Sequence, residues 1–292
     1  MKEREPMGLF DLFKPNVEKL ESSKDIAGLL KALQDKKNPE IRDAAGVALG
    51  RISDQQIVNP LLQAVKDGNV SVLQASTILG KIGNKGGIEP LIHALRDNNV
   101  NVRCTVATAL GQVGDKRAID PLIHVLETDD NTTVRSDAAH SLARLGWQST
   151  NDIQNAWYLI ALEDWEKLLK LGEPAIEPLV QVIKLKGNNS RVTAVKILGQ
   201  IGGAKAVDPL IDLLHDEDSL VREIAALWLG EIGDRKAVKP LIQVLESRDY
   251  LTVRHYAAQS LKKMGDTSAT NMINAVELEA ENEGRALVQR FF

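Results

Sequence analysis

Histidine and cysteine are the residues of this sequence that could hold a metal ion or act as a nucleophile, and they are few. The sequence contains His93, His124, His140, His215, His255 and Cys104. The first two histidines each lie three residues after a proline, so they could approach each other, but no third ligand follows at the spacing of a zinc site. Cys104 has no neighbouring histidine to activate its thiol. We therefore expect no metal, no cofactor and no catalytic centre.

Signatures of phosphate and nucleic-acid binding are also missing. Lys and Arg number 36 against 40 Asp and Glu, a net charge of −4, whereas nucleic-acid binders usually carry a basic excess. The glycine-containing runs of the Leu-Gly-x-Ile-Gly type end predicted helices, whereas a nucleotide-binding loop follows a strand. The composition argues against a nucleic-acid partner.

The elements that would position any site come from internal repeats with a period of about 31 residues. A proline followed by two aliphatic residues marks each unit, and a leucine, usually followed by glycine, marks its second half. We call these the landmark leucines: Leu49, Leu79, Leu110, Leu142, Leu198, Leu229 and Leu261. An arginine precedes most of them by seven residues. Three landmarks with one period indicate tandem structural units.

Each unit is predicted to contain two helices. Residues 118–126 are apolar at the i, i+3, i+4 and i+7 positions of an amphipathic helix, and a second helix is expected over 132–145. Glycines such as Gly114 and Gly233 follow the second helices, where a left-handed residue ends a helix. One helix pair cannot bury its apolar side alone, so successive pairs must stack as a solenoid.

Residues 102–123 resemble the HEAT repeat superfamily. The residues that carry the resemblance are Val-Arg at the start, Ala-Leu-Gly-Gln-Val-Gly-Asp in the middle and Pro-Leu-Ile at the end. More narrowly, this run is similar to the short HEAT-like repeats of the phycobilin (PBS) lyase type. The resemblance covers about residues 25–265. It implies an all-α fold, a right-handed α-α superhelix of about eight helix-pair repeats of which one is degenerate.

Residues 1–24 and 266–292 flank the repeats and are expected to form an N-terminal capping segment and a C-terminal capping helix with a tail, since open solenoids need caps. The amphipathic stretch 8–14 could instead touch a membrane surface or join two copies end to end. No apolar run is long enough to span a membrane, and there is no signal peptide. We expect a cytoplasmic monomer or weak homo-oligomer.

The repeat is irregular at residues 147–172, because the interval between Pro121 and Pro178 is 57 residues. Two short helices are predicted there, near 151–162 and 164–171. Three of the four tryptophans lie in this degenerate unit: Trp147, Trp157 and Trp165. They either fill the core of an irregular repeat or form an aromatic platform for a partner.

The recurrent arginine also has two interpretations. Arg103, Arg135, Arg222 and Arg254 each follow a valine and have an aspartate five or six residues upstream. They predict either an Arg–Asp ladder between units or an arginine-lined groove for an acidic ligand. Val72 takes the arginine position in one unit, which suits a structural element that tolerates one loss.

The resemblance implies that the second helices line the concave side of the stack. Outward positions on these helices give the candidate partner-binding residues Asp137, His140, Arg144, Lys196, Leu220, Glu223, Ile224, Leu227, His255, Tyr256 and Gln259. The strip at 220–227 is unusually apolar for an exposed surface, and an apolar patch is a typical interaction site. The alternative is that Leu220 and Ile224 are core residues and the helical phase is shifted.

These observations predict a non-catalytic scaffold that binds a protein or peptide partner on the concave face. From the resemblance alone, the alternative is a bilin-lyase-like subunit or an accessory component of an oxidoreductase system. HEAT-like di-iron hydroxylases carry repeated His-Glu pairs. Here each histidine is followed by Ala, Val, Ser, Asp or Tyr, so the resemblance does not extend to that activity.

Overall fold

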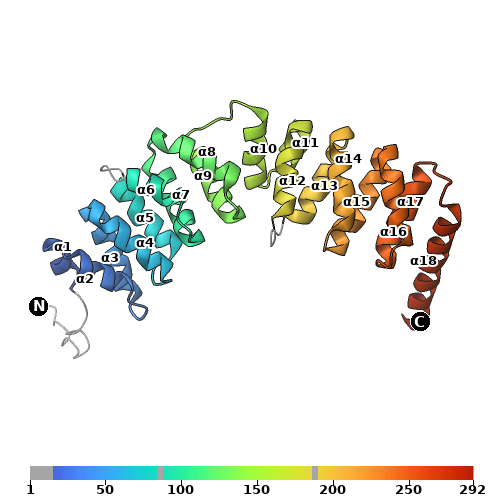
Figure 1. Cartoon of the computed structure of the whole chain (residues 1–292). Helices are drawn as coiled ribbons and strands as arrows, with labels where there is room; N and C mark the ends of the chain where they lie inside the picture. The colour runs from blue at the N-terminus through green and yellow to red at the C-terminus, as the bar shows by residue number, and fades with distance from the viewer. Residues whose placement is uncertain (1–15, 84–87, 186–189, 292) are drawn as a thin grey trace, which may run out of the picture. The chain divides into compact units, whose positions relative to one another are not determined.

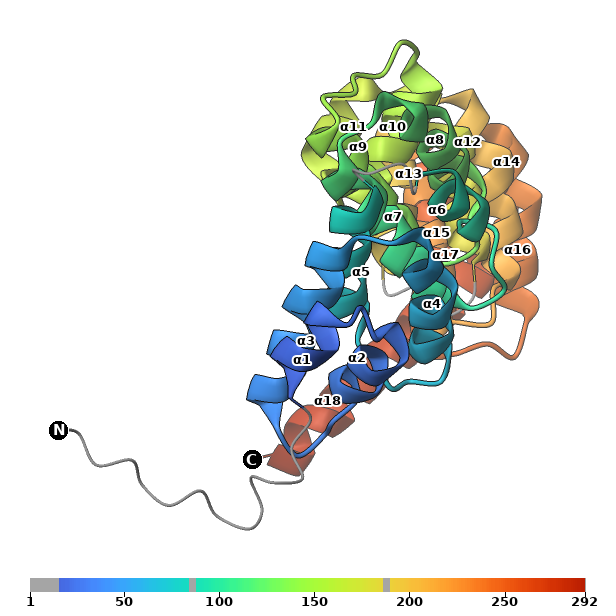
Figure 2. The same cartoon turned by 90° about the vertical axis from the view of Figure 1, so that its left-hand side faces the viewer.

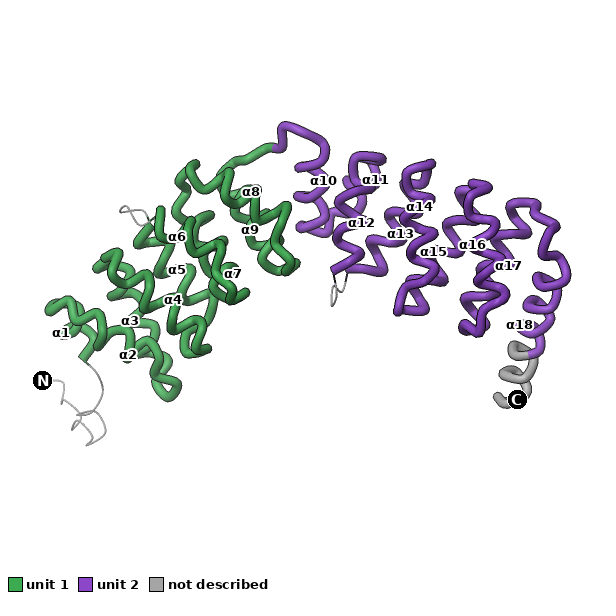
Figure 3. Tube along the Cα trace, in the orientation of Figure 1, with its two compact units in different colours: residues 1–148 green, residues 149–292 purple. Residues whose placement is uncertain are grey.

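A computed structural model describes residues 16–83, 88–185 and 190–291, with side chains as far as residue 282. Its elements within these ranges are helices, without strands (Figure 1), which confirms the all-α solenoid. The chain divides into two compact units, Met1–Gln148 and Ser149–Phe292 (Figure 3). The stretch 8–14 lies outside the described residues. No helix in the described part of the chain has the length and apolar character of a membrane span.

Unit 1 starts with α1 (Val17–Ser22) and continues as helix pairs. The first helices of the pairs are α2 (Ile26–Leu33), α4 (Val58–Lys66), α6 (Ile88–Ala94) and α8 (Ile119–Thr128). The second helices are α3 (Pro39–Ile52), α5 (Val72–Ile82), α7 (Val100–Val113) and α9 (Thr132–Arg144). Short 3-10 turns, η2 (Gln55–Ile57) and η4 (Lys116–Ala118), lead into α4 and α8. Figure 2 shows α3 and α5 on one side of this unit and α2 and α4 on the other.

Unit 2 starts with the degenerate repeat, α10 (Asp152–Ala161) and α11 (Trp165–Leu171), where two short helices were predicted. Three regular pairs follow: α12 (Ile176–Lys184) with α13 (Arg191–Ile201), α14 (Ala204–Asp212) with α15 (Ser219–Ile232), and α16 (Val238–Glu246) with α17 (Leu251–Lys263). Turns η5 (Glu173–Ala175), η6 (Leu213–His215) and η7 (Arg235–Ala237) complete these pairs. The last helix, α18 (Thr270–Phe291), packs against α17 and α16.

The sequence landmarks become the core and the turns. Every landmark leucine is fully buried, and so is the leucine after each unit proline: Leu61, Leu91, Leu122, Leu179, Leu210 and Leu241. Gly114 and Gly233 end α7 and α15 in the left-handed conformation. Asp115 and Asp234 then accept a hydrogen bond from the backbone N–H two residues ahead and start the next 3-10 turn. Each unit therefore repeats one packing solution.

The recurrent arginines form a ladder from one repeat to the next. Arg103 donates through Nε and Nη2 to the two carboxylate oxygens of Asp129, at 2.7 and 2.9 Å, and Arg222 does the same to Asp249, at 2.7 and 2.6 Å. Two further arginines of unit 2 form equivalent hydrogen-bonded ion pairs, Arg191 with Asp216 and Arg254 with Glu279 of α18. Each of these carboxylates lies in the repeat or helix after the arginine's own helix pair, so the inter-repeat ladder holds for these four arginines. Arg135 differs, because it donates to the backbone carbonyl of Asp129 in its own repeat.

The ladder continues where the arginine is missing. In the unit with Val72, Lys66 at the end of α4 places its Nζ 2.7 Å from a carboxylate oxygen of Asp97 in the following repeat. Arg103 also donates through Nη1 to the backbone carbonyl of Asp97, at 3.0 Å. Asp97 thus links the repeat of α4 to its own repeat, whose Arg103 pairs with Asp129 of the next one.

Replacing Arg222 by alanine is expected to lower the free energy of unfolding by about 2 kcal/mol at pH 7, because it leaves the largely buried Asp249 carboxylate without its main donor. The Arg222 guanidinium lowers the pKa of Asp249 below its ordinary value of 3.8. The folded state therefore holds this proton less tightly than the unfolded state. The stabilisation by the Arg222–Asp249 pair is therefore complete at pH values above the ordinary pKa of Asp249. It is lost as the pH falls through the lowered pKa of the folded state.

Urea titrations of the native chain and of Arg222→Ala should therefore differ most above pH 4 and converge in more acidic solution. Arg235→Ala is the matched control, because its guanidinium is mostly exposed and lies 3.4 Å from Asp266. We expect it to leave the unfolding curve nearly unchanged, since exposed ion pairs contribute little. Equal effects of both variants would contradict a stabilising ladder.

Candidate functional site

The surface of the second helices follows a simple rule around each landmark leucine. The residues two positions before it, which we call the pre-leucine row, are Val47, Thr77, Thr108 and His140 in unit 1 and Lys196, Leu227 and Gln259 in unit 2. The residues two positions after it, the post-leucine row, are Arg51, Lys81, Gln112 and Arg144, then Gln200, Glu231 and Lys263. All of them are exposed or half-buried. The two rows lie four residues apart on each helix and so share one face, which we call the second-helix face.

Within each unit these faces lie side by side. In unit 1, α3 packs on α5, α5 on α7 and α7 on α9; in unit 2, α13 packs on α15 and α15 on α17. Each row therefore offers one residue per repeat. That the second helices form the concave side of the stack stays a prediction.

The structure places most predicted partner-binding residues at accessible positions. Those that are exposed are His140, Arg144, Lys196, Leu220 and Gln259, and those that are half-buried are Asp137, Glu223, Leu227, His255 and Tyr256. Ile224 is the exception, because only 7% of it is exposed. Its assignment to the outward strip is wrong. The position five residues before the landmark leucine is buried as Ile224 and Thr105 but half-buried as Asp137 and Tyr256, so it lies at the border between the packed and the exposed face of the helix.

Side chains of α15 and α17 are linked across the second-helix face of unit 2. The Thr252 hydroxyl donates to a carboxylate oxygen of Glu223. On α17, Gln259 Nε2 lies 2.8 Å from His255 Nε2, and the His255 and Tyr256 rings meet edge to face with centroids 6.3 Å apart. Exposed Leu220 and half-buried Leu227 lie seven residues apart on α15 and so share one face of that helix.

Cys104 is held in an unreactive state at the boundary between α7 and α9. It is buried, and burial, together with its hydrogen bond to the Asp137 carboxyl, raises the pKa of the thiol to about 12. Burial likewise raises the pKa of Asp137 above its ordinary value. The thiolate is the nucleophilic form, so this cysteine is a packing residue.

We expect Cys104 to resist labelling by an aromatic disulfide reagent in the folded chain at pH 8. At that pH, well below the raised pKa, almost none of the buried thiol is ionised. Complete labelling should follow unfolding in guanidinium chloride, read from the released thiolate absorbance. Asp137→Asn removes the neighbouring negative charge and should accelerate labelling of the folded chain. Fast labelling of the native protein would contradict the protected state.

The tryptophans of the degenerate unit do not form one exposed platform. Trp157 lies in the core of α10 with 5% of its surface exposed, so its assignment to a partner-binding platform is wrong. Trp147 and Trp165 are half-buried. The packing interpretation therefore holds for Trp157, and recognition by Trp147 or Trp165 stays a prediction.

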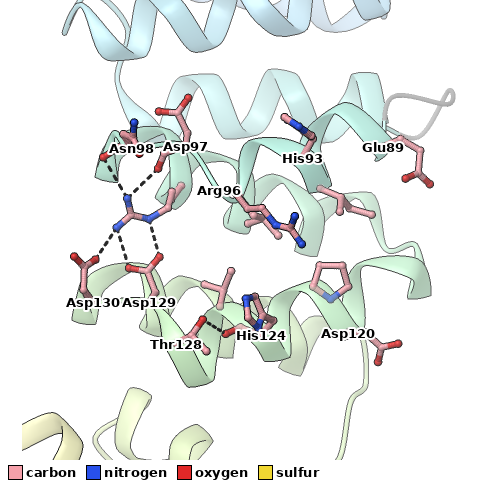
Figure 4. A pocket seen from close by; sticks show the side chains of 15 residues that line it. Glu89, His93, Arg96, Asp97, Asn98, Asp120, His124, Thr128, Asp129 and Asp130 are labelled. Carbon is pink, nitrogen blue, oxygen red and sulfur yellow. Dashed lines mark hydrogen bonds and ion pairs between the residues drawn. The ribbon is translucent and has the colours of Figure 1, made fainter.

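A groove of about 990 Å³ runs between α6 and α8 on the first-helix side of unit 1 (Figure 4). His93, His124 and Arg96 line it, and the two histidines occupy the same position in adjacent repeats. Most of its carboxylates are already paired. These pairs join Glu89 to Arg117, Asp97 to Lys66, and both Asp129 and Asp130 to Arg103. Among the described residues, no three His, Cys, Asp or Glu side chains gather as metal ligands.

Comparison with known proteins supports the repeat assignment. The family profile described as HEAT repeats matches residues 73–143, 159–227, 176–262 and 208–276, more than half of the chain. The profile of the PBS lyase HEAT-like repeat matches residues 41–67. No curated protein matches the sequence.

Solved structures that align with most of this chain have low sequence identity and low TM-scores. Human deoxyhypusine hydroxylase is 20% identical, with 89% of this chain and 91% of that chain covered and a TM-score of 0.33. The complex of CpcE and CpcF of phycocyanin lyase from Nostoc is 18% identical, with coverages of 86% and 94% and a TM-score of 0.29. A computationally designed armadillo repeat protein for modular peptide recognition is 16% identical, with coverages of 82% and 99% and a TM-score of 0.32.

Proposed function

This chain belongs to the HEAT repeat family, and from that premise we propose that it is a scaffold that binds a protein or peptide partner on its second-helix faces. The observation that carries the proposal is the regular exposure of the pre-leucine and post-leucine rows. The landmark leucines between them form the core, and the ladder arginines are engaged in holding repeats together. The two rows are thus surface positions that the fold leaves available for a partner.

The chemistry of the unit 2 face supports this function. Leu220 is an exposed large apolar residue. Leu227 lies seven residues later on α15, about two turns along the same face of the helix. Tyr256 and His255 add aromatic surface from α17. Protein interfaces commonly combine an apolar and aromatic centre with a polar rim. No observation on the described residues favours the lyase-like or oxidoreductase-accessory alternative, and we do not propose it.

Site-specific photo-crosslinking of the full chain in cells tests the proposal. A photoreactive residue in place of Gln259 on α17 should capture a defined partner. The matched control replaces Gln181, an exposed glutamine on first helix α12 of the same unit. Capture from Gln259 but not from Gln181 is the expected result, and Leu220→Glu should reduce it at least tenfold without changing the helical circular dichroism. Equal capture from both positions, or none, would overturn the proposal.

A further inference from the structure

The post-leucine row differs in charge between the two units. In unit 1 its residues are Arg51, Lys81, Gln112 and Arg144, three cations and no anion. In unit 2 it contains Gln200, Glu231 and Lys263, and an ion pair joins Lys263 to Glu231. The post-leucine row of unit 2 therefore has no net charge, whereas that of unit 1 has a net charge of +3.

The cations of the unit 1 row have little to balance them. Lys81 and Arg144 form no ion pair with any described residue, and the Arg51 guanidinium, 69% exposed, lies 3.6 Å from Glu21. Helices α5 and α7 contain no acidic residue, and the two of α3, Glu40 and Asp43, lie in its first half, at least two turns from Arg51. The single carboxyl of α9, Asp137, is hydrogen-bonded to Cys104. Cations do favour helix C-termini, but Glu231 at the same position of α15 shows that the fold does not demand them.

Lys81 reaches across to the neighbouring helix of the row. A Cβ atom added to Gly50 would lie 2.7 Å from Cδ of Lys81, so the Lys81 side chain packs over the last turn of α3, at the residue before Arg51. Gln112 crosses Gly80 in the same way on the next helix. An extended chain lying across α3, α5, α7 and α9 would meet one of these side chains at each repeat.

Two exposed apolar side chains share helix faces with these cations. Val47 lies one turn before Arg51 on α3 and is 42% exposed, and Leu73 lies two turns before Lys81 on α5 and is 73% exposed. Nucleic-acid binders owe their affinity to many phosphate contacts, whereas three cations on faces that also carry aliphatic side chains suit glutamate or aspartate interleaved with apolar residues. We propose that unit 1 binds an acidic, leucine-containing peptide segment of a partner along its post-leucine row. This inference rests on the proposed scaffold function and names the partner's chemistry.

Fluorescence anisotropy with the full chain tests this inference. The probe is a short fluorescein-labelled peptide in which glutamate and leucine alternate with serine, and a single-stranded DNA of equal length is the second probe. Lys81→Glu/Arg144→Glu should weaken peptide binding about tenfold. The matched control, Lys116→Glu/Lys239→Glu, makes the same change in net charge at two exposed lysines outside the second-helix faces and should weaken it less than about twofold. Higher salt should weaken binding by the native chain.

Each outcome decides for or against the row. No peptide binding by the native chain, equal losses in the two double variants, or tighter binding of the DNA would overturn the inference. If circular dichroism shows that the double glutamate variant is unfolded, Lys81→Gln/Arg144→Gln takes its place with the same expected ordering. Partner capture from Gln259 together with a negative peptide result would leave the scaffold function standing and reject only the acidic-peptide inference.

Discussion

Trp157→Ala is expected to lower the free energy of unfolding by about 3–5 kcal/mol, the range for truncating a large buried aromatic side chain. Trp157 lies inside the degenerate repeat beside the buried Leu159 and Ile160 of α10. Alanine would leave a cavity that these short helices cannot close without moving. Urea unfolding followed by circular dichroism at 222 nm measures the loss.

Trp165→Ala is the control for this prediction. Trp165 starts α11 and is half-buried, so its truncation should cost less than half as much. A Trp157→Ala chain that keeps its stability but loses its crosslinked partner would contradict the packing role and restore the platform hypothesis.

Gly230→Ala is expected to lower the free energy of unfolding by about 2–3 kcal/mol, as overpacking does in a rigid core. An added Cβ would lie 2.6 Å from Cα of Ser260 and 2.4 Å from its Oγ. Because a backbone atom is among these contacts, α15 and α17 would have to separate. That movement would also strain the 2.8 Å hydrogen bond that the Ser260 hydroxyl donates to the carbonyl of Ala226.

Gly46→Ala offers a matched control with the opposite sign. Gly46 also lies inside a second helix, α3, but a Cβ there would meet only side-chain carbons at 3.5 and 3.6 Å. We expect stability to rise by up to about 1 kcal/mol, the helix-propensity difference between glycine and alanine. If thermal melts of both variants moved in the same direction, close helix approach would not explain why Gly230 must lack a side chain.

The glycine after five of the seven landmark leucines shows what the sequence could and could not predict. The repeat marks these positions in the sequence, but only the structure shows that a side chain there would meet the next helix, as at Gly230. A Cβ on Gly199 would lie 2.1 Å from Cγ of Trp228, so the indole occupies the space that the missing side chain leaves in the preceding repeat.

Periodicity predicted the helix pairs, their caps and the buried leucines, because these depend on residues close together in the sequence. The predicted outward orientation of Ile224 was wrong, because the neighbouring helix determines whether a residue at the border of two helix faces is buried. The Lys66–Asp97 ion pair could not be predicted from the sequence either. Val72 predicted a repeat without an inter-repeat ion pair, and only the three-dimensional path of α4 shows that Lys66 of the first helix forms one.

The candidate site shows the same division. Residues such as His140, Arg144 and Gln259 were selected correctly as accessible, since helical phase fixes them. The unit 1 row was selected only at Arg144, although counting two residues past each landmark leucine would have found Arg51 and Lys81. Whether a cation is paired depends on side-chain contacts between repeats, which sequence spacing alone does not determine.

The forward reach of the ladder gives unit 2 a polarity along its chain. Arg222 depends on Asp249 in the following repeat, and Arg254 depends on Glu279 in α18. Removing repeats of unit 2 one at a time from its C-terminal end would each time leave an arginine without its carboxylate partner. Removing them from the N-terminal end would instead leave a carboxylate without its arginine. Successive truncations should therefore be tolerated unequally, with fraying that starts at α18 and travels back toward α12.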